Sequence, residues 1–177
     1  MNKKLKLWEL DRVSEEEFKL QEKFPIIVIL DNIRSLNNIG SFFRTSDAFN
    51  VEKVYLCGIT ATPPHRDIQK TALGATESME WEHTISTLDL VNELKKEGVK
   101  ICSIEQAEKT TLLHEVPKLP DGKYALVFGN EVDGVDQAVI DASDYIIEIP
   151  QFGTKHSLNV SVCAGAVLWE FAKRNIL

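Results

Sequence analysis

The sequence lacks cysteine pairs, long apolar runs and metal-binding motifs. Its three cysteines, Cys57, Cys102 and Cys163, are odd in number, far apart and without a C-x-x-C pair. A disulfide scaffold is therefore excluded, and each cysteine is expected to be a small buried apolar residue in a reducing cytoplasm. The longest unbroken apolar run, Ile26 to Leu30, is too short to cross a bilayer. We expect no targeting segment and no membrane partner.

Two further absences narrow the function. The four histidines, His65, His83, His114 and His156, show no metal-ligand spacing, so no metal site is predicted. Neither a G-x-x-x-x-G-K-S/T loop nor a G-x-G-x-x-G fingerprint is present. A nucleotide-binding enzyme such as a kinase or a dehydrogenase is therefore a poor interpretation.

The length and composition suit one globular domain. The 177 residues are 44% hydrophobic and 27% charged, enough for a single core without disulfides. The formal net charge is −7, but residues 77–148 carry 16 acidic and 6 basic groups, whereas the rest of the chain is close to neutral. A local anion site is compatible with that distribution. We predict an N-terminal extension over 1–22, with a short helix after Ser14 outside the core, and one domain over 23–177.

Short apolar runs alternate with helical patterns along the chain. Strands are expected at 26–30, 54–57, 79–84, 99–104, 124–128 and 145–149. Helices are expected at 39–49, from Ser86 to a stop at Gly98, and over the final apolar stripe at 160–171. This alternation predicts an α/β fold with a mostly parallel sheet covered by helices on both faces. Residues 110–122 are expected to form a surface loop crossing the sheet edge.

Three polar, glycine-containing stretches follow strands, where ligand sites of such sheets are built. In the first, 31–44, Asn38 either caps a helix or, with Arg44, holds an anion or a ribose near the helix start. The second, 128–134, is either a tight acidic turn or a place of close backbone approach at its glycines. In the third, 149–161, Ser157 or Asn159 caps the last helix or contributes to a site. None of the three is specific alone.

Together and in this order, the three stretches resemble the motifs of the SpoU-type (TrmH-like) RNA 2′-O-ribose methyltransferases of the SPOUT superfamily. The first matches Asn-x-Gly-x-x-x-Arg at Asn38, Gly40 and Arg44. The second matches Phe-Gly-Asn-Glu-x-x-Gly at 128–134, and the third matches Ile-Pro…Gly…Ser-Leu-Asn-Val-Ser at 149–161. Val132 and Gln151 depart from the family pattern. The resemblance covers residues 25–172, and the third motif is its most specific part.

The resemblance implies an α/β-knot with a C-terminal trefoil knot, S-adenosylmethionine as cofactor, and a homodimer with the site at its interface. The residues it implies for catalysis are Asn38, Arg44, Glu131, Ser157 and Asn159. Those it implies for cofactor binding are Phe128, Gly129, Asn130, Glu131, Ile149, Gln151, Ser157 and Leu158.

These residue types suit methyl transfer to a ribose hydroxyl, which depends on in-line positioning and on stabilisation of a developing alkoxide. A guanidinium is a poor base, so Arg44 is expected to act as a charged donor. Only RNA offers a 2′-hydroxyl, so the expected partner is RNA, with tRNA first and rRNA second. The alternative is an RNA-binding or assembly module that keeps the fold without catalysis.

A polar stretch at 63–71 is the candidate for further RNA contact. Arg66 and Lys70, together with Arg34 of the first motif, are assigned to RNA binding, although Arg66 and Lys70 are equally compatible with plain solvation. Lys3, Lys4 and Lys6 are expected to be only solvated.

Overall fold

A computed structural model describes residues 2–10, 12–155 and 157–176 of the chain. Within these residues seven strands form one sheet in the order β3-β2-β1-β6-β4-β7-β5, and all neighbouring pairs are parallel. The strands are β1 (Phe24–Asp31), β2 (Val51–Cys57), β3 (Trp81–Thr84), β4 (Lys100–Ile104), β5 (Thr111–Leu112), β6 (Tyr124–Gly129) and β7 (Tyr145–Glu148). The predicted α/β class with a mostly parallel sheet is confirmed.

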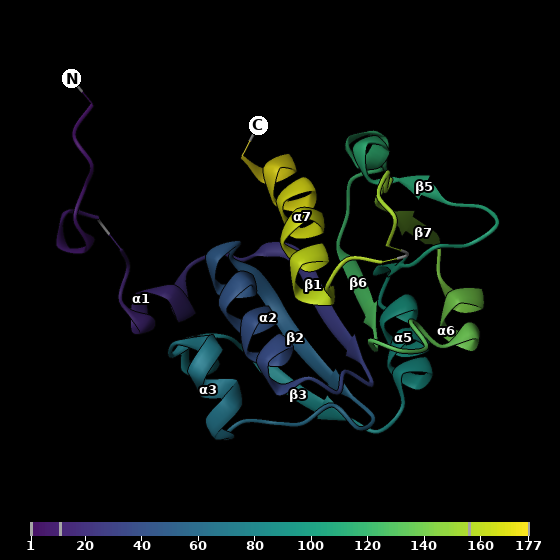
Figure 1. Ribbon diagram of the computed structural model, residues 1–177, viewed down its shortest axis with the longest axis horizontal. Helices are drawn as coiled ribbons and strands as arrows, with labels where there is room; N and C mark the ends of the chain where they lie inside the picture. Colours follow the sequence, from purple (N-terminus) through teal and green to yellow (C-terminus); the bar gives the residue numbers. More distant parts are fainter. Residues whose placement is uncertain (1, 11, 156, 177) are drawn as a thin grey trace.

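Helices cover both faces of the sheet (Figure 1). One face carries α2 (Leu36–Ala48), α3 (Arg66–Ala72), the 3-10 helix η2 (Leu113–Lys118) and α7 (Val160–Ala172), which share one apolar cluster. The other face carries α5 (Thr87–Lys96) and α6 (Gln137–Ala142). The remaining elements are η1 (Leu7–Glu9), α1 (Glu15–Leu20), α4 (Ala75–Ser78) and η3 (Lys173–Asn175).

The central strands are apolar throughout because both of their faces are covered. Along β1, Val28 packs into the cluster beneath α2 and α7, whereas its neighbours Ile27 and Ile29 pack against the α5 and α6 side. Leu126 of β6, beside Val28 in register, is likewise fully buried. The run at 26–30 that marked the first strand in the sequence is therefore the middle of the core.

Several helix ends lie where the sequence placed them. Ser86 caps α5 by accepting a hydrogen bond from the amide of Asp89, and Gly98 follows the helix with a positive φ of 85°. Asn159 caps α7 by accepting from the amides of Ser161 and Val162. The last helix therefore begins directly at the third motif.

Gly40 sets how closely α2 approaches α3. A Cβ at this position would lie 2.1 Å from Thr71 Oγ1 and 2.2 Å from the Ile68 carbonyl oxygen. The Thr71 hydroxyl in turn donates to the carbonyl of Asn37, 3.0 Å away. The glycine of the first motif is thus explained by helix packing.

The structure decides one open alternative and corrects three expectations. Ser35, not Asn38, caps α2, because the Ser35 hydroxyl accepts from the Asn38 amide and the Asn38 side chain is used elsewhere. The stretch 110–122 is not only a loop, since it forms edge strand β5 and η2, whose Val116 is buried. The N-terminal helix forms as α1 after its Ser14 cap, but its Phe18 belongs to the core.

The third corrected expectation is the strand at 79–84. Met79 ends the short helix α4, and the strand begins only at Trp81. The sequence also gave no sign of the six-residue helix α6. Among the described residues no helix has both the length and the apolar character needed to cross a membrane.

Candidate functional site

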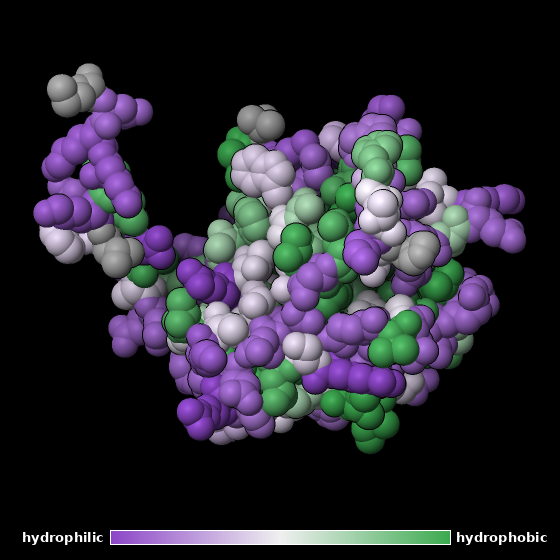
Figure 2. Space-filling model, in the orientation of Figure 1, coloured by the Kyte–Doolittle hydropathy of each residue, from purple (hydrophilic) through white to green (hydrophobic). Residues whose placement is uncertain are grey.

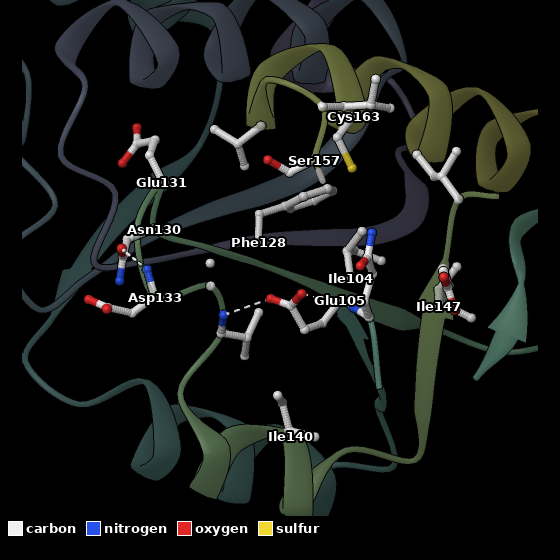
Figure 3. Close-up of a pocket in the computed structure, with 18 of the residues that line it drawn as sticks. Ile104, Glu105, Phe128, Asn130, Glu131, Asp133, Ile140, Ile147, Ser157 and Cys163 are labelled. Carbon is white, nitrogen blue, oxygen red and sulfur yellow. Dashed lines mark hydrogen bonds between the residues drawn. The ribbon is translucent and has the colours of Figure 1, made fainter. Parts of the chain in front are cut away.

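A cavity of about 820 Å³ opens at the carboxyl ends of β4, β6 and β7 (Figure 3). Its wall is built mainly from residues 104–106, 128–137, 147–149 and 157–160. Ligands of parallel sheets bind at this edge, where the strand order departs from the chain order. The volume lies within the range of sites for cofactors and small molecules.

The loop after β6 is a tight turn built around Asn130. The backbone of Asn130 pairs with that of Gly134, and its side-chain Oδ1 accepts from the amides of Val132 and Asp133 at 2.8 and 2.9 Å. A Cβ at Gly129 would lie 2.0 Å from the carbonyl carbon of Gly134. The first glycine of the second motif is therefore required for this backbone approach.

Two carboxylates from other strands hold the far end of this loop. Glu105, directly after β4, accepts from the amide of Val135 through Oε2 at 3.1 Å. Asp31, at the end of β1 and only 2% exposed, accepts from the amide of Asp136 at 3.1 Å and from the hydroxyl of Thr87 at 2.6 Å. Sequence reasoning assigned no role to either residue, although both lie where an apolar strand gives way to polar residues.

Glu131 joins the loop to the start of α2. Its carboxylate accepts hydrogen bonds from the amides of Arg34 and Ser35, both at 3.1 Å, and from Nδ2 of Asn38 at 2.9 Å. Partial burial raises the pKa of Glu131, but these hydrogen bonds outweigh it, so the pKa lies below its usual value. Glu131 is therefore ionised at neutral pH and serves as an acceptor for the helix terminus.

Asn38 also contacts the third motif through a second hydrogen bond of its side chain. Its Oδ1 accepts from Nδ2 of Asn159 at 3.2 Å, and Asn159 caps α7 with its own Oδ1. One hydrogen-bond chain, Glu131–Asn38–Asn159, thus joins all three motifs. Each side-chain amide both donates and accepts in it, so its oxygen and nitrogen positions are fixed by the neighbouring groups.

The structure brings most of the predicted residues together. All eight residues predicted for cofactor binding line the cavity, namely Phe128, Gly129, Asn130, Glu131, Ile149, Gln151, Ser157 and Leu158. Asn159 lines it as well, and Asn38 is bonded to two of the lining residues.

Arg44 and the predicted RNA-binding residues lie outside the cavity. Arg44 is exposed on α2, and among the described residues it forms no hydrogen bond or ion pair. Arg66 and Lys70 are exposed on α3. Arg34 is also exposed and forms an ion pair of 3.7 Å with Asp133 at the rim of the cavity.

The cavity combines an apolar wall with negative charge. Ile104, Phe128, Ile147, Ile149 and Leu158 supply apolar surface. The acidic residues of the lining are Glu105, Glu131, Asp133, Asp136 and Glu148, and none of the described lining residues is lysine or arginine. Such a site suits a ligand with a flat apolar part and a positive charge.

Cysteine and histidine add no nucleophile or metal centre to the part of the chain that is described. Burial raises the pKa of Cys163, which faces the cavity, to about 11, so its thiol stays protonated. Cys57 and Cys102 are buried and free. No group of three or more possible metal ligands occurs there. His65 caps α3 and His83 contacts the Gly58 carbonyl, whereas His156 lies outside the described residues.

Comparison with known proteins points to one family. The model of the SpoU rRNA Methylase family matches residues 25–169. The chain is 34% identical to a 23S rRNA (guanosine-2′-O-)-methyltransferase of Neisseria meningitidis, over 86% of this chain and 60% of that protein. It is 29% identical to a TrmH family tRNA/rRNA methyltransferase of Staphylococcus saprophyticus, over 90% of this chain and 63% of that protein. The chain thus spans about three-fifths of the length of these relatives.

Solved structures share the fold. The TrmH/SpoU tRNA modifying enzyme of A. aeolicus superposes with a TM-score of 0.81 at 25% identity, over 92% of this chain and 81% of that chain. The SpoU methyltransferase AviRb of Streptomyces viridochromogenes, solved with AdoMet, superposes with a TM-score of 0.75 at 23% identity, over 90% of this chain and 61% of that chain. The second likeness concerns the fold alone.

Proposed function

The chain belongs to the SpoU rRNA methylase family, and from this premise we propose that it transfers a methyl group from S-adenosylmethionine to a ribose 2′-hydroxyl of a structured RNA. The observation that carries the proposal is the hydrogen-bond chain Glu131–Asn38–Asn159 beside the cavity. It fixes polar side chains from three separate motifs where a cofactor and a ribose would meet. The reducing cytoplasm is the proposed compartment, in keeping with three free cysteines.

The cavity suits the proposed cofactor in volume and in charge. Ile149 and Leu158 offer apolar surface for the adenine, and we assign the edge of the adenine to backbone groups of the same loops. Glu131 and Asp133 place negative charge near the position proposed for the cationic sulfur. The cofactor would supply the electrophilic methyl group.

In this proposal the site residues position the reacting groups, and none of them is assigned to transfer a proton. Asn38 and Asn159 are held by their mutual hydrogen bond, and the Ser157 hydroxyl is exposed at the cavity wall. Because the Glu131 carboxylate is ionised and already accepts three hydrogen bonds, we assign it to orientation of the α2 terminus. A guanidinium is a poor base and a strong hydrogen-bond donor, so we assign Arg44 to the target phosphate and the developing alkoxide.

We propose a homodimer, which the position of Arg44 and the surface of α7 support. Arg44 lies outside the cavity of its own chain, so a second copy is proposed to bring its Arg44 to the site. On α7, Val162 is 61% exposed and Trp169 is 52% exposed, and with exposed Ala166 they form a stripe at helical spacing. Figure 2 shows pale and green residues along this helix. We assign this exposed apolar stripe to the proposed interface.

A trefoil knot is also proposed for the C-terminal segment. After β7, near one edge of the sheet, the chain returns to α7, which packs across β1 and β6 beside α2 (Figure 1). Residues 157–160 then line the same cavity as the loop 129–136. This return past the earlier loop is the arrangement that a knot requires.

Transfer RNA is the first proposed substrate and ribosomal RNA the second. The tRNA assignment is supported by the A. aeolicus enzyme, of which this chain covers 81%. The rRNA assignment is supported by the Neisseria relative, which acts on 23S rRNA as its name states.

One experiment tests the proposed function and separates the two RNA classes. Purified protein is incubated with methyl-labelled cofactor and with separate tRNA and rRNA fractions, and the labelled nucleotide is mapped. We expect label at a ribose 2′-oxygen, absent with Glu131→Ala. Cofactor and RNA binding without transfer to any RNA fraction would favour the silent RNA-binding module.

A further inference from the structure

Glu105 occupies a part of the cavity that the three motifs do not explain. It follows β4 directly and lines the cavity on the side away from Glu131, next to Ile104 (Figure 3). Its side chain is only partly exposed. No residue of the hydrogen-bond chain Glu131–Asn38–Asn159 contacts it.

The orientation of the Glu105 carboxylate is fixed by two backbone amides. Oε2 accepts from Val135 at 3.1 Å, and Oε1 accepts from Gln106 at 2.8 Å. A carboxylate has about four acceptor positions, so each oxygen keeps one for a ligand. The absence of a side chain at Gly134 makes room for this arrangement, because a Cβ there would lie 2.1 Å from Oε2.

This inference rests on the proposed function. The position of Glu105 then determines which part of the cofactor it contacts. The reacting end is assigned to Glu131, and the adenine to the wall at Ile149 and Leu158. The sugar that joins the adenine to the sulfur would then lie between them, and Figure 3 shows Glu105 between Glu131 and Ile147 of β7. We infer that Glu105 binds the two ribose hydroxyls of the cofactor's adenosine, one through each carboxylate oxygen.

A vicinal diol matches this carboxylate better than a single donor does. Its two hydroxyl groups are neighbouring donors, and Glu105 presents two neighbouring acceptor positions in one plane. Hydrogen bonds to an ionised group are stronger than those between neutral groups, so removal of either hydroxyl should weaken binding measurably. Because the backbone amides orient the carboxylate before the ligand arrives, little ordering is required on binding.

Calorimetry with modified ligands tests the inference without a methylation assay. The wild-type protein is titrated with S-adenosylhomocysteine and with its 2′-deoxy and 3′-deoxy analogues. We expect each deoxy analogue to bind about tenfold more weakly or worse, as hydrogen bonds to a charged group predict. In Glu105→Gln and Glu105→Asp, which remove the charge or withdraw the carboxylate, this deoxy penalty should fall to about threefold or less.

Glu148→Gln is the matched control. Glu148 lines the same cavity and loses the same charge, but its carboxylate accepts from the Thr110 hydroxyl at 2.8 Å. We expect the wild-type deoxy penalty in this variant. If the deoxy penalty came from the general negative charge of the cavity, it would fall equally in Glu105→Gln and Glu148→Gln.

Each outcome separates the inference from the proposed function. If the wild type binds the parent ligand and both analogues equally, the assignment of Glu105 is overturned and the proposed function stands. If the Glu105 variants weaken all three ligands by one common factor, Glu105 only holds the loop at Val135, and the inference is also overturned. If the wild type binds none of them, the proposed function itself fails. The wild-type comparison remains decisive even if a variant does not fold.

Discussion

The carboxylate of Glu131 and the side-chain amide of Asn38 are 93 residues apart in the sequence and 2.9 Å apart in the structure. This contact ties the loop after β6 to the first turn of α2. Glu131 also accepts from the amide of the N-cap Ser35, which the helix itself leaves unpaired, and from the amide of Arg34 just before it. The relationship makes Glu131 a part of the fold as well as of the site.

Glu131 should stabilise the protein in a pH-dependent way. Its pKa is lowered on folding, so its contribution is complete above the unfolded value of about 4.3 and is lost as pH falls through the folded value. We expect wild type to exceed Glu131→Gln in free energy of unfolding at neutral pH, with the difference shrinking below about pH 4.3. Denaturant titrations across pH provide the measurement.

Asn38→Ala supplies the control for this pH effect. It removes the side-chain donor to Glu131, so the Glu131→Gln effect should be smaller in the Asn38→Ala background. A wild-type advantage that persists undiminished at pH 3 would show that the carboxylate charge is not its source.

Gly40→Ala should destabilise the packing of α2 on α3. The added Cβ would meet Thr71 Oγ1 and the Ile68 carbonyl oxygen, and overpacking of this kind costs about 1–3 kcal/mol. Thermal unfolding of the variant measures the effect. Ser41→Ala, at the next position of the same helix, should change the stability by less than about 0.5 kcal/mol. Equal melting temperatures for wild type and Gly40→Ala would contradict the close approach.

How much the sequence revealed depended on whether the signal was local. The apolar run at 26–30 and the Ser86 cap identified β1 and α5, since strand burial and capping use neighbouring residues. The role of Asn38, cap or site residue, stayed open because both Asn38 and Ser35 are good capping residues. Only the tertiary contact with Glu131 decides between them. Short elements such as β5 and α6 contain too few residues for a periodic pattern of apolar residues to be recognised.

Some residues of the candidate site could also be predicted from the sequence, and others could not. The residues that line the cavity were predicted from the family resemblance, because they belong to the three motifs that carry it. Glu105 and Asp31 were not, although each lies at the end of a strand. Their role depends on hydrogen bonds to backbone amides of a distant loop. Every residue except proline has such an amide, so the residue types of that loop do not reveal the contact.

RNA binding should depend on Arg66 and Lys70. Both are exposed on α3, and removing one phosphate-binding side chain should reduce the slope of log affinity against log salt by roughly 0.7 to 0.9. We expect Arg66→Ala with Lys70→Ala to bind tRNA more weakly and with a flatter slope. The control replaces Lys96 and Lys109, exposed lysines of the acidic segment, and should keep the wild-type slope. An unchanged slope in the first variant would remove α3 from the RNA footprint.

The apolar stripe on α7 should hold the dimer together. Val162→Asp with Trp169→Glu places two charges on it. By sedimentation at micromolar concentration we expect the wild type to be a dimer and this variant a monomer. Ile85→Asp, at an exposed apolar residue outside α7, should leave the dimer intact. A wild-type monomer, or a dimer that survives both charges, would place the interface elsewhere.

Mixed dimers of two inactive variants would show whether Arg44 acts within its own chain or on the partner. Arg44→Ala and Glu131→Ala should each be inactive as homodimers, the first lacking the guanidinium and the second lacking the carboxylate beside the cavity. When they are unfolded together in equal amounts and refolded, half of the dimers are mixed. If Arg44 acts on the partner, each mixed dimer has one complete site, so about a quarter of the wild-type activity returns, as random pairing into symmetric dimers requires. If Arg44 acts within its own chain, both sites of a mixed dimer lack one residue and no activity returns. Recovery of activity therefore supports the shared site, and its absence in a verified mixed dimer rejects it.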